Sequence, residues 1–223
     1  MRFALPIAFL LCLVALIAIS PHLEPRRLRA RARAIAEALR AEHGFRDGSL
    51  ASWAQARATG WPPFHYGKHP QLDDLLLGTL YGLPVRIAGY EVVHTGTRHR
   101  YGLALVVLPR PVPWLEVRGQ RPFSAARVAE HIPDGQVTLG VATFDANWSV
   151  YAESPEALRE TAGSAALVQS MLGAPTRFSW RMRDTELLLW KRDGWSDAPE
   201  LLASIGCVAH LLGLADTDVP ALL

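Results

Sequence analysis

The chain has 223 residues, of which 50% are hydrophobic and 20% are charged, and its formal net charge is +2. This length allows one domain of ordinary size beside a short accessory segment, and the apolar content excludes a disordered chain. The basic residues are concentrated in one segment: residues 21–46 have a net charge of +4, whereas residues 47–223 have a net charge of −3. The larger part lacks the basic surface that nucleic-acid binding requires, so we expect no nucleic acid partner.

The first element is an uncharged apolar run from Phe3 to Ser20. At 1.5 Å per helical residue, such a run is about long enough to cross a hydrocarbon core of roughly 30 Å. The alternative is a cleaved secretory signal, but Pro21 follows the nearest small-residue cleavage site and disfavours cleavage there. We therefore predict that residues 1–20 form a retained transmembrane anchor.

An arginine-rich flank follows this run, with Arg26, Arg27, Arg29, Arg31 and Arg33, whereas only Arg2 precedes it. Because positive flanks stay cytoplasmic, we predict a single-pass membrane protein whose C-terminal domain faces the cytoplasm. These arginines are also candidates for contact with anionic lipid, where each basic residue gains about 1 kcal/mol. A stop-transfer role alone is the simpler interpretation.

Residues 21–44 are predicted to form a basic stalk helix, since Pro25 suits a first helical turn and Gly44 ends the apolar periodicity. Residues 45–71 contain glycine and proline at a density that neither helix nor strand tolerates, so we predict an irregular connector. Its aromatic side chains are expected to hold it against the folded domain.

Residues 72–223 are enough for one domain with a hydrophobic core. Short β-rich runs within residues 75–118 predict an antiparallel meander. Pro109, Pro111 and Pro113 are expected to end its third strand, because proline cannot donate a hydrogen bond to a ladder.

One strand of this meander has apolar residues that change parity, with Val85 and Ile87 at odd positions and Tyr90 and Val92 at even positions. If all four side chains face one core, the strand must contain an extra residue. We therefore predict a β-bulge at Gly89, because glycine tolerates the backbone angles of a bulge.

The remaining chain is expected to add two strands and a helix, over residues 137–143, 148–152 and 154–173. Ser154 is the predicted N-cap of that helix. Alternation across residues 178–191 predicts a hairpin that turns at Asp184, and Asp197 with Glu200 predicts the capped start of a last helix. Because strands and helices do not alternate, the domain is predicted to be α+β, with a mainly antiparallel sheet, flat or curled, covered by two helices.

Several spaced motifs carry a family resemblance. They are Pro62-Pro63-Phe64-His65-Tyr66-Gly67, then Leu75 to Val85 with Tyr90, and later Phe144-Asp145 with Trp148-Ser149-Val150-Tyr151. In this order they resemble the motifs of uncharacterised bacterial single-pass membrane proteins with a soluble domain of unknown function. The resemblance implies a membrane-tethered domain and assigns no catalytic residue.

Residues suited to metal binding or catalysis are few. His65 and His69 are four apart, but the surrounding prolines and glycines exclude a helix there, so we predict no metal site. Asp73-Asp74 is expected to be a solvated turn or cap, and Cys207 is expected to be a buried thiol. No glycine-rich loop joins a strand to a helix, so no cofactor is expected.

Two function classes remain. We favour a membrane-tethered interaction or sensory module that binds a protein or a small apolar ligand without catalysis. Its candidate groove residues are Trp61, Phe64 and Trp114. The alternative is a membrane-anchored hydrolase-type enzyme that uses His65, Asp73 or His99, but no recognisable nucleophile and base accompany them. We therefore assign no catalytic residue.

Overall fold

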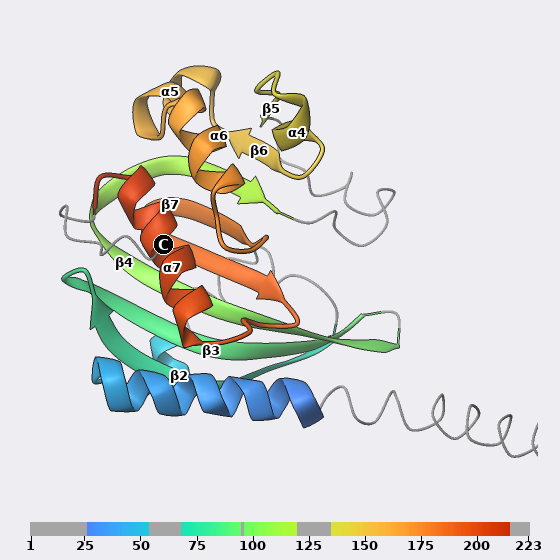
Figure 1. Ribbon diagram of the computed structural model, residues 1–223, viewed down its shortest axis with the longest axis vertical. Coiled ribbons are helices and arrows are strands. Elements are labelled where there is room, and N and C mark those ends of the chain that lie inside the picture. Colours follow the sequence, from blue (N-terminus) through green and yellow to red (C-terminus); the bar gives the residue numbers. More distant parts are fainter. Residues whose placement is uncertain (1–25, 54–67, 95, 120–134, 215–223) are drawn as a thin grey trace, which may run out of the picture.

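The computed structural model describes residues 26–53, 68–94, 96–119 and 135–214. Within these ranges the chain forms an antiparallel sheet with helices packed along it (Figure 1). None of the described helices combines the length and the apolar character needed to cross a membrane. The predicted anchor, residues 1–20, lies outside the described ranges and stays a prediction.

The described strands are β1 (Arg46–Asp47), β2 (Lys68–Leu80), β3 (Leu83–His94), β4 (Thr97–Arg118), β5 (Gln136–Val137), β6 (Ser149–Ala152) and β7 (Ser179–Arg192). The helices are an N-terminal helix (residues 26–43), the 3-10 helix η1 (Leu50–Trp53), α4 (Ala142–Asp145), α5 (Pro155–Thr161), α6 (Ser164–Leu172) and α7 (Ala198–Leu211). The strand order is β1-β2-β3-β4-β6-β5, and β7 pairs with β4. Every strand pair is antiparallel, which confirms the α+β class with a mainly antiparallel sheet.

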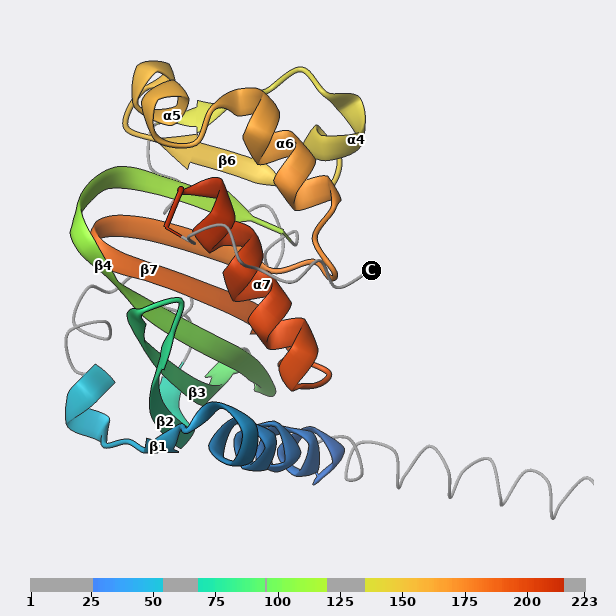
Figure 2. The ribbon, with the colours of Figure 1, turned by 60° about the vertical axis from the view of Figure 1, so that its left-hand side comes forward.

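The long strand β4 holds the two halves of the sheet together. It pairs with β3 as far as Val106 and with β6 from Leu115 onward, so the two partners occupy successive stretches of β4. The strand passes through its three prolines between these stretches, and the prediction that they end a strand was wrong. Successive residues of a strand direct their N–H groups to alternate edges, so prolines two residues apart all lack the N–H group on the same edge. That edge cannot form ladder hydrogen bonds there, but the strand itself continues. The strand bends strongly there (Figures 1 and 2).

The partner strand β7 follows the same bend, so the predicted hairpin at Asp184 is also wrong. Asp184 has a φ of 52° and pairs with Val112, and the register between β4 and β7 shifts on both sides of this pair. What looked like a turn in the sequence is an irregularity inside one continuous strand. It lets β7 stay paired with β4 on both sides of the bend.

Strand β3 is regular, and the predicted bulge at Gly89 is wrong. Its pairing with β4 runs without a register shift from Val85 to His94, so Ile87 and Tyr90 lie on opposite faces of the sheet. Each face has its own buried apolar cluster. The change of parity therefore reflects a strand that is buried on both sides.

The bulge lies instead in the neighbouring strand β2. Three steps along β2, from Asp73 to Leu76, correspond to two steps along β3, from Gly89 to Ile87. Asp74 is in this interval and has a φ of 50°, a left-handed conformation that aspartate tolerates better than most residues. The extra residue is therefore accommodated opposite Gly89.

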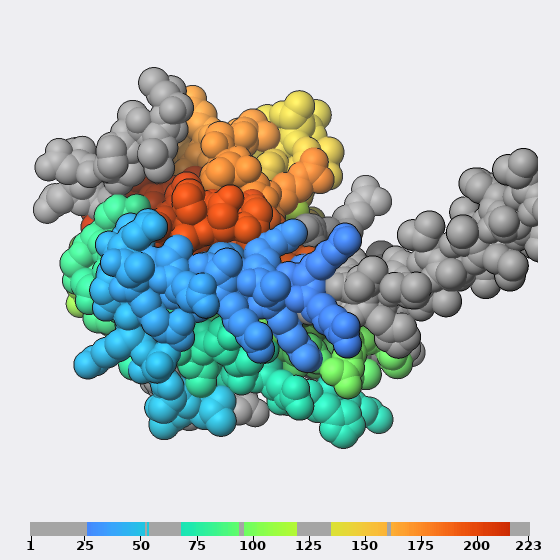
Figure 3. All heavy atoms as spheres, turned by 60° about the horizontal axis from the view of Figure 1, so that its bottom comes forward, coloured from blue at the N-terminus to red at the C-terminus, as the bar shows by residue number. Residues whose placement is uncertain are grey.

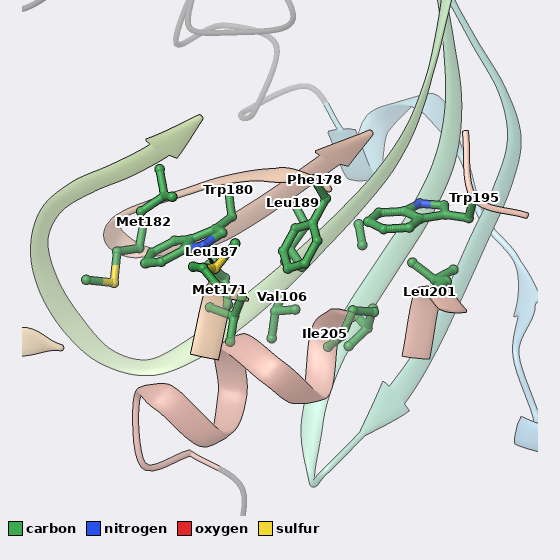
Figure 4. Packing of buried hydrophobic residues seen from close by; sticks show 14 of the residues in the cluster. Val106, Met171, Phe178, Trp180, Met182, Leu187, Leu189, Trp195, Leu201 and Ile205 are labelled. Atoms are coloured by element: carbon green, nitrogen blue, oxygen red, sulfur yellow. Dashed lines mark hydrogen bonds between the residues drawn. The ribbon is translucent and has the colours of Figure 1, made fainter. Parts of the chain in front are cut away.

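The larger core cluster lies between the sheet and the helices. Figure 4 shows Trp180 and Leu189 of β7 with Ile205 of α7 in this cluster, and Trp180 Nε1 donates to Met171 Sδ of α6 at 3.2 Å. The smaller cluster on the opposite face includes Trp53 of η1 and Trp190. Trp148, Trp180 and Trp190 are all buried.

The N-terminal helix is part of this packing. Ile35, Ala36 and Leu39 of its apolar stripe are buried in the larger cluster, and Arg40 forms an ion pair of 2.6 Å with Asp47 of β1. Figures 2 and 3 show the helix lying along the sheet, with α7 beside it on the same side. The helix predicted as a stalk therefore lies flat on the domain.

For the remaining helices, the predicted starting residues are correct but the predicted lengths are not. Ser154 Oγ accepts a hydrogen bond from the Ala157 amide at 3.0 Å, which confirms this N-cap. The helix predicted over 154–173 is divided, because Gly163 with a φ of 64° separates α5 from α6. The strand predicted over 137–143 was mostly wrong, since β5 ends at Val137 and α4 follows.

The last helix, α7, begins as predicted. The Glu200 amide donates to Asp197 Oδ1 at 2.8 Å, and Lys191 Nζ forms an ion pair of 2.7 Å with Glu200 Oε1. Burial alone would raise the pKa of Glu200, but hydrogen bonds from Lys191 and Ser196 outweigh it and lower this pKa to about 2. The start of α7 is thus joined to the end of β7.

Candidate functional site

The predicted groove residues fall in different parts of the chain. Trp61 and Phe64 lie outside the described residues. Trp114 is in the second half of β4 and only 8% exposed. The aromatic groove therefore stays a prediction.

Of the residues named for a hydrolase, the two that the structure describes, Asp73 and His99, are not brought together. His65 lies outside the described residues, while Asp73 pairs with Gly89 and His99 pairs with Val92. Because Gly89 and Val92 have opposite parity in a regular strand, Asp73 and His99 face opposite sides of the sheet. These two side chains cannot act on one substrate atom.

Cys207 is poorly suited to be a nucleophile. Its thiol donates to the Ser170 carbonyl oxygen at 3.3 Å and lies 3.2 Å from Ser170 Oγ, joining α7 to α6. Burial raises the pKa of Cys207, and this effect exceeds the opposite effect of the Ser170 hydrogen bond. Since the thiolate is the reactive form, the thiol is held in its unreactive state.

A cluster of charged side chains lies above Gly89, where the sequence predicted only a solvated turn. Arg100 is 7% exposed, and its guanidinium donates to both carboxylate oxygens of Asp73 at 2.9 and 3.0 Å and to Asp74 Oδ2 at 2.9 Å. Burial and the neighbouring Asp73 charge raise the pKa of Asp74, although Arg100 acts in the opposite direction. The two carboxylates are thus structural partners of one buried cation.

The same cluster reaches the N-terminal helix. Glu91 forms ion pairs with Arg98 at 2.8 Å and with Arg29 of the helix at 3.4 Å, and it lies 4.0 Å from Arg100. Acidic side chains of the sheet therefore compensate part of the basic charge of the helix. Arg29 and Arg98 are half exposed or more, so each of these pairs contributes at most about 1 kcal/mol.

Two neighbouring glycines leave a small area of the sheet without side chains between the N-terminal helix and the start of α7. Gly89 and Gly102 are direct cross-strand partners. The Asp73–Arg100 pair lies over Gly89, and the buried Trp195 ring lies over Gly102. The pocket between these groups has a volume of about 40 Å³. This is room for a few water molecules at roughly 10–15 Å³ each, and it is too small for an organic ligand.

A larger apolar hollow lies where β4 bends past the end of α7. Its volume is about 270 Å³, compared with about 150 Å³ for an engineered cavity that binds benzene. We call it the proline-bend groove, and its lining residues are Leu108, Pro109, Arg110, Pro111, Val112, Pro113, Leu212 and Leu214. Arg110 is its single charged residue.

The end of α7 shapes the second wall of this groove. Gly213 has a φ of 64°, the Leu214 amide donates to the Ala209 carbonyl at 2.8 Å, and the Gly213 amide donates to the His210 carbonyl at 3.0 Å. This pair of bonds is the Schellman motif, which turns the chain back at a helix end. It directs Leu212 and Leu214 toward the bend of β4, and both walls are therefore held by backbone geometry.

Another buried charged group lies in the second half of the sheet. Glu116 is fully buried and forms an ion pair with Arg118, whose guanidinium lies 4.7 Å from the centre of the Tyr151 ring. Burial lowers the pKa of Arg181, on the paired strand β7, to about 10, although Glu116 acts to raise it. We assign this group to stability, because its charges are buried and compensate one another.

No protein-family model matches the chain, and the curated proteins include no match. Among solved structures, the chain is similar to the crystal structure of the mycobacterial trehalose monomycolate transport factor A, TtfA. The TM-score is 0.55 and the sequence identity is 14%, over 85% of this chain and 94% of that chain. At this identity the similarity shows a shared fold.

Proposed function

We propose that this domain is a non-catalytic, membrane-tethered module that binds the apolar part of a lipid-like ligand in the proline-bend groove. The observation that carries the proposal is the groove itself, which has a volume of about 270 Å³ and is lined by seven apolar residues and one arginine. Apolar surface gains roughly 25 cal/mol for each Å² removed from water, so a hydrocarbon chain is the ligand that such a lining favours.

The ligand class has support from the structural comparison. TtfA is named a transport factor for trehalose monomycolate, which is a glycolipid, and it shares the fold over most of both chains. We extend from that name only the class of ligand, a lipid.

The membrane tether has support from the N-terminal helix. Arg26, Arg27 and Arg31 are exposed along it, and it begins shortly after the apolar run while packing directly on the sheet. A domain attached in this way would be held close to the bilayer surface, with basic side chains available to anionic lipid. Under this proposal the domain is on the cytoplasmic side, and the tether places the groove near its source of ligand.

The test is binding of an apolar fluorescent probe, N-phenyl-1-naphthylamine, to the full chain held in amphipol. Val112→Glu, within the groove, is expected to weaken binding by at least about tenfold, because its carboxylate, whether hydrated or paired with Arg110, replaces apolar surface that the probe would cover. The matched control is Val141→Glu, which makes the same change at an exposed valine before α4.

The control variant should bind the probe as the unchanged chain does. Leu214→Glu provides a second groove variant outside the strands, and it should weaken binding in the same way. If the unchanged chain does not bind the probe, or if both groove variants bind it with unchanged affinity, the proposal is wrong.

A further inference from the structure

Four arginines lie on β4, and one of them differs from the others. Arg98 pairs with Glu91 at 2.8 Å, Arg100 pairs with Asp73 at 2.9 Å, and Arg118 pairs with Glu116. Arg110 is exposed and forms no ion pair or hydrogen bond within the described part of the chain. This cation is also the charged member of the groove lining.

The position of Arg110 restricts what the groove can accept. Pro109 and Pro111 fix the backbone φ angle on either side of it, so the arginine is presented from a stiff segment. Apolar residues line the groove on both walls and Arg110 is the charged residue among them, so we place the polar end of a bound ligand beside its guanidinium. Guanidinium groups favour carboxylate and phosphate oxygens, with which they form charge-assisted hydrogen bonds.

We propose that the ligand is a single-chain anionic amphiphile, of the fatty-acid class, whose chain lies in the proline-bend groove and whose head group contacts Arg110. This inference rests on the proposed function and adds the charge of the ligand. The groove has about 270 Å³, nearly twice the roughly 150 Å³ of a cavity that binds benzene. A chain on the order of ten carbons therefore fits the groove.

The experiment compares dodecanoate with dodecanol, which has the same chain without a charge. Each displaces N-phenyl-1-naphthylamine from the full chain in amphipol, at a pH where the carboxylate is ionised. The unchanged chain is expected to prefer dodecanoate by about fivefold, which is the scale of a partly exposed ion pair. Arg110→Gln is expected to abolish this preference, because it removes the charge that distinguishes the two compounds.

Two further variants separate the charge from other effects. Arg110→Lys keeps the cation and should retain most of the preference, and Arg98→Gln removes an exposed cation elsewhere on β4 and should change nothing. High salt should weaken dodecanoate binding but not dodecanol binding.

The outcomes distinguish a failure of this inference about charge from a failure of the proposed function. If dodecanol and dodecanoate bind equally, or if Arg110→Gln keeps the preference, the inference about charge is wrong while the apolar groove stands. If neither compound displaces the probe and the groove variants bind it unchanged, the proposed function itself is wrong.

Discussion

Replacing Gly89 with valine is expected to lower the free energy of unfolding by about 2 kcal/mol. The backbone of Gly89 is not left-handed, so the reason is space. A Cβ atom at this position would lie 2.0 Å from Asp73 Oδ1 and 2.6 Å from Arg100 Nη2. The added side chain must therefore push the Asp73 carboxylate away from Arg100, so that the buried guanidinium loses its bidentate partner and keeps Asp74. Chemical denaturation of the full chain, followed by tryptophan fluorescence, measures the change.

The matched control is a double-mutant cycle. Gly89→Ala is expected to be destabilising by itself, and the loss should shrink when Asp73→Ala is already present, because the closest atom has been removed. A coupling energy of at least about 1 kcal/mol would support this reason. Additive losses, or a neutral Gly89→Val, would mean that the ion pair does not occupy the space above Gly89.

Replacing Glu116 with leucine is expected to cost about 3 kcal/mol, because breaking a buried ion pair leaves an uncompensated charge in the interior. Glu116 is fully buried and pairs with Arg118, and it also compensates the buried Arg181. The measurement is again the free energy of unfolding of the full chain.

The control for this prediction changes both members of the pair. Arg118→Met by itself should also be destabilising, but the variant with both Glu116→Leu and Arg118→Met should be less destabilised than the sum of the two. A stable Glu116→Leu chain would instead show that this carboxylate is not the main partner of the buried arginines.

Local signals in the sequence predicted what depends on local structure. The N-caps at Ser154 and Asp197 were confirmed, since a cap needs only a side chain and an amide a few residues away.

Errors arose where a residue's role depended on a partner strand far along the chain. Proline at 109, 111 and 113 predicted the end of a strand, but β4 continues because it pairs with β7 on both sides of the bend. Gly89 predicted a bulge, but its missing side chain leaves space for the ion pair between Asp73 of β2 and Arg100 of β4. Periodicity within one segment contains no information about either partner.

The groove was beyond prediction for a similar reason. Its walls come from residues 108–113 and from Leu212 and Leu214, which are about a hundred residues apart in the chain. No spacing rule links them, and they meet because α7 crosses the bent sheet before its Schellman turn. A single hint was present, in an arginine between two prolines with no acidic residue nearby in the sequence.

Photolabelling tests the central claim most directly. The full chain in amphipol is irradiated with a diazirine-bearing dodecanoate, and the labelled peptides are located by mass spectrometry. We predict that labels fall within residues 108–113 and 212–214, and that Val112→Glu removes them while Val141→Glu does not. Labels confined to other parts of the chain, or labels that persist unchanged in Val112→Glu, would contradict a lipid-binding role for the proline-bend groove.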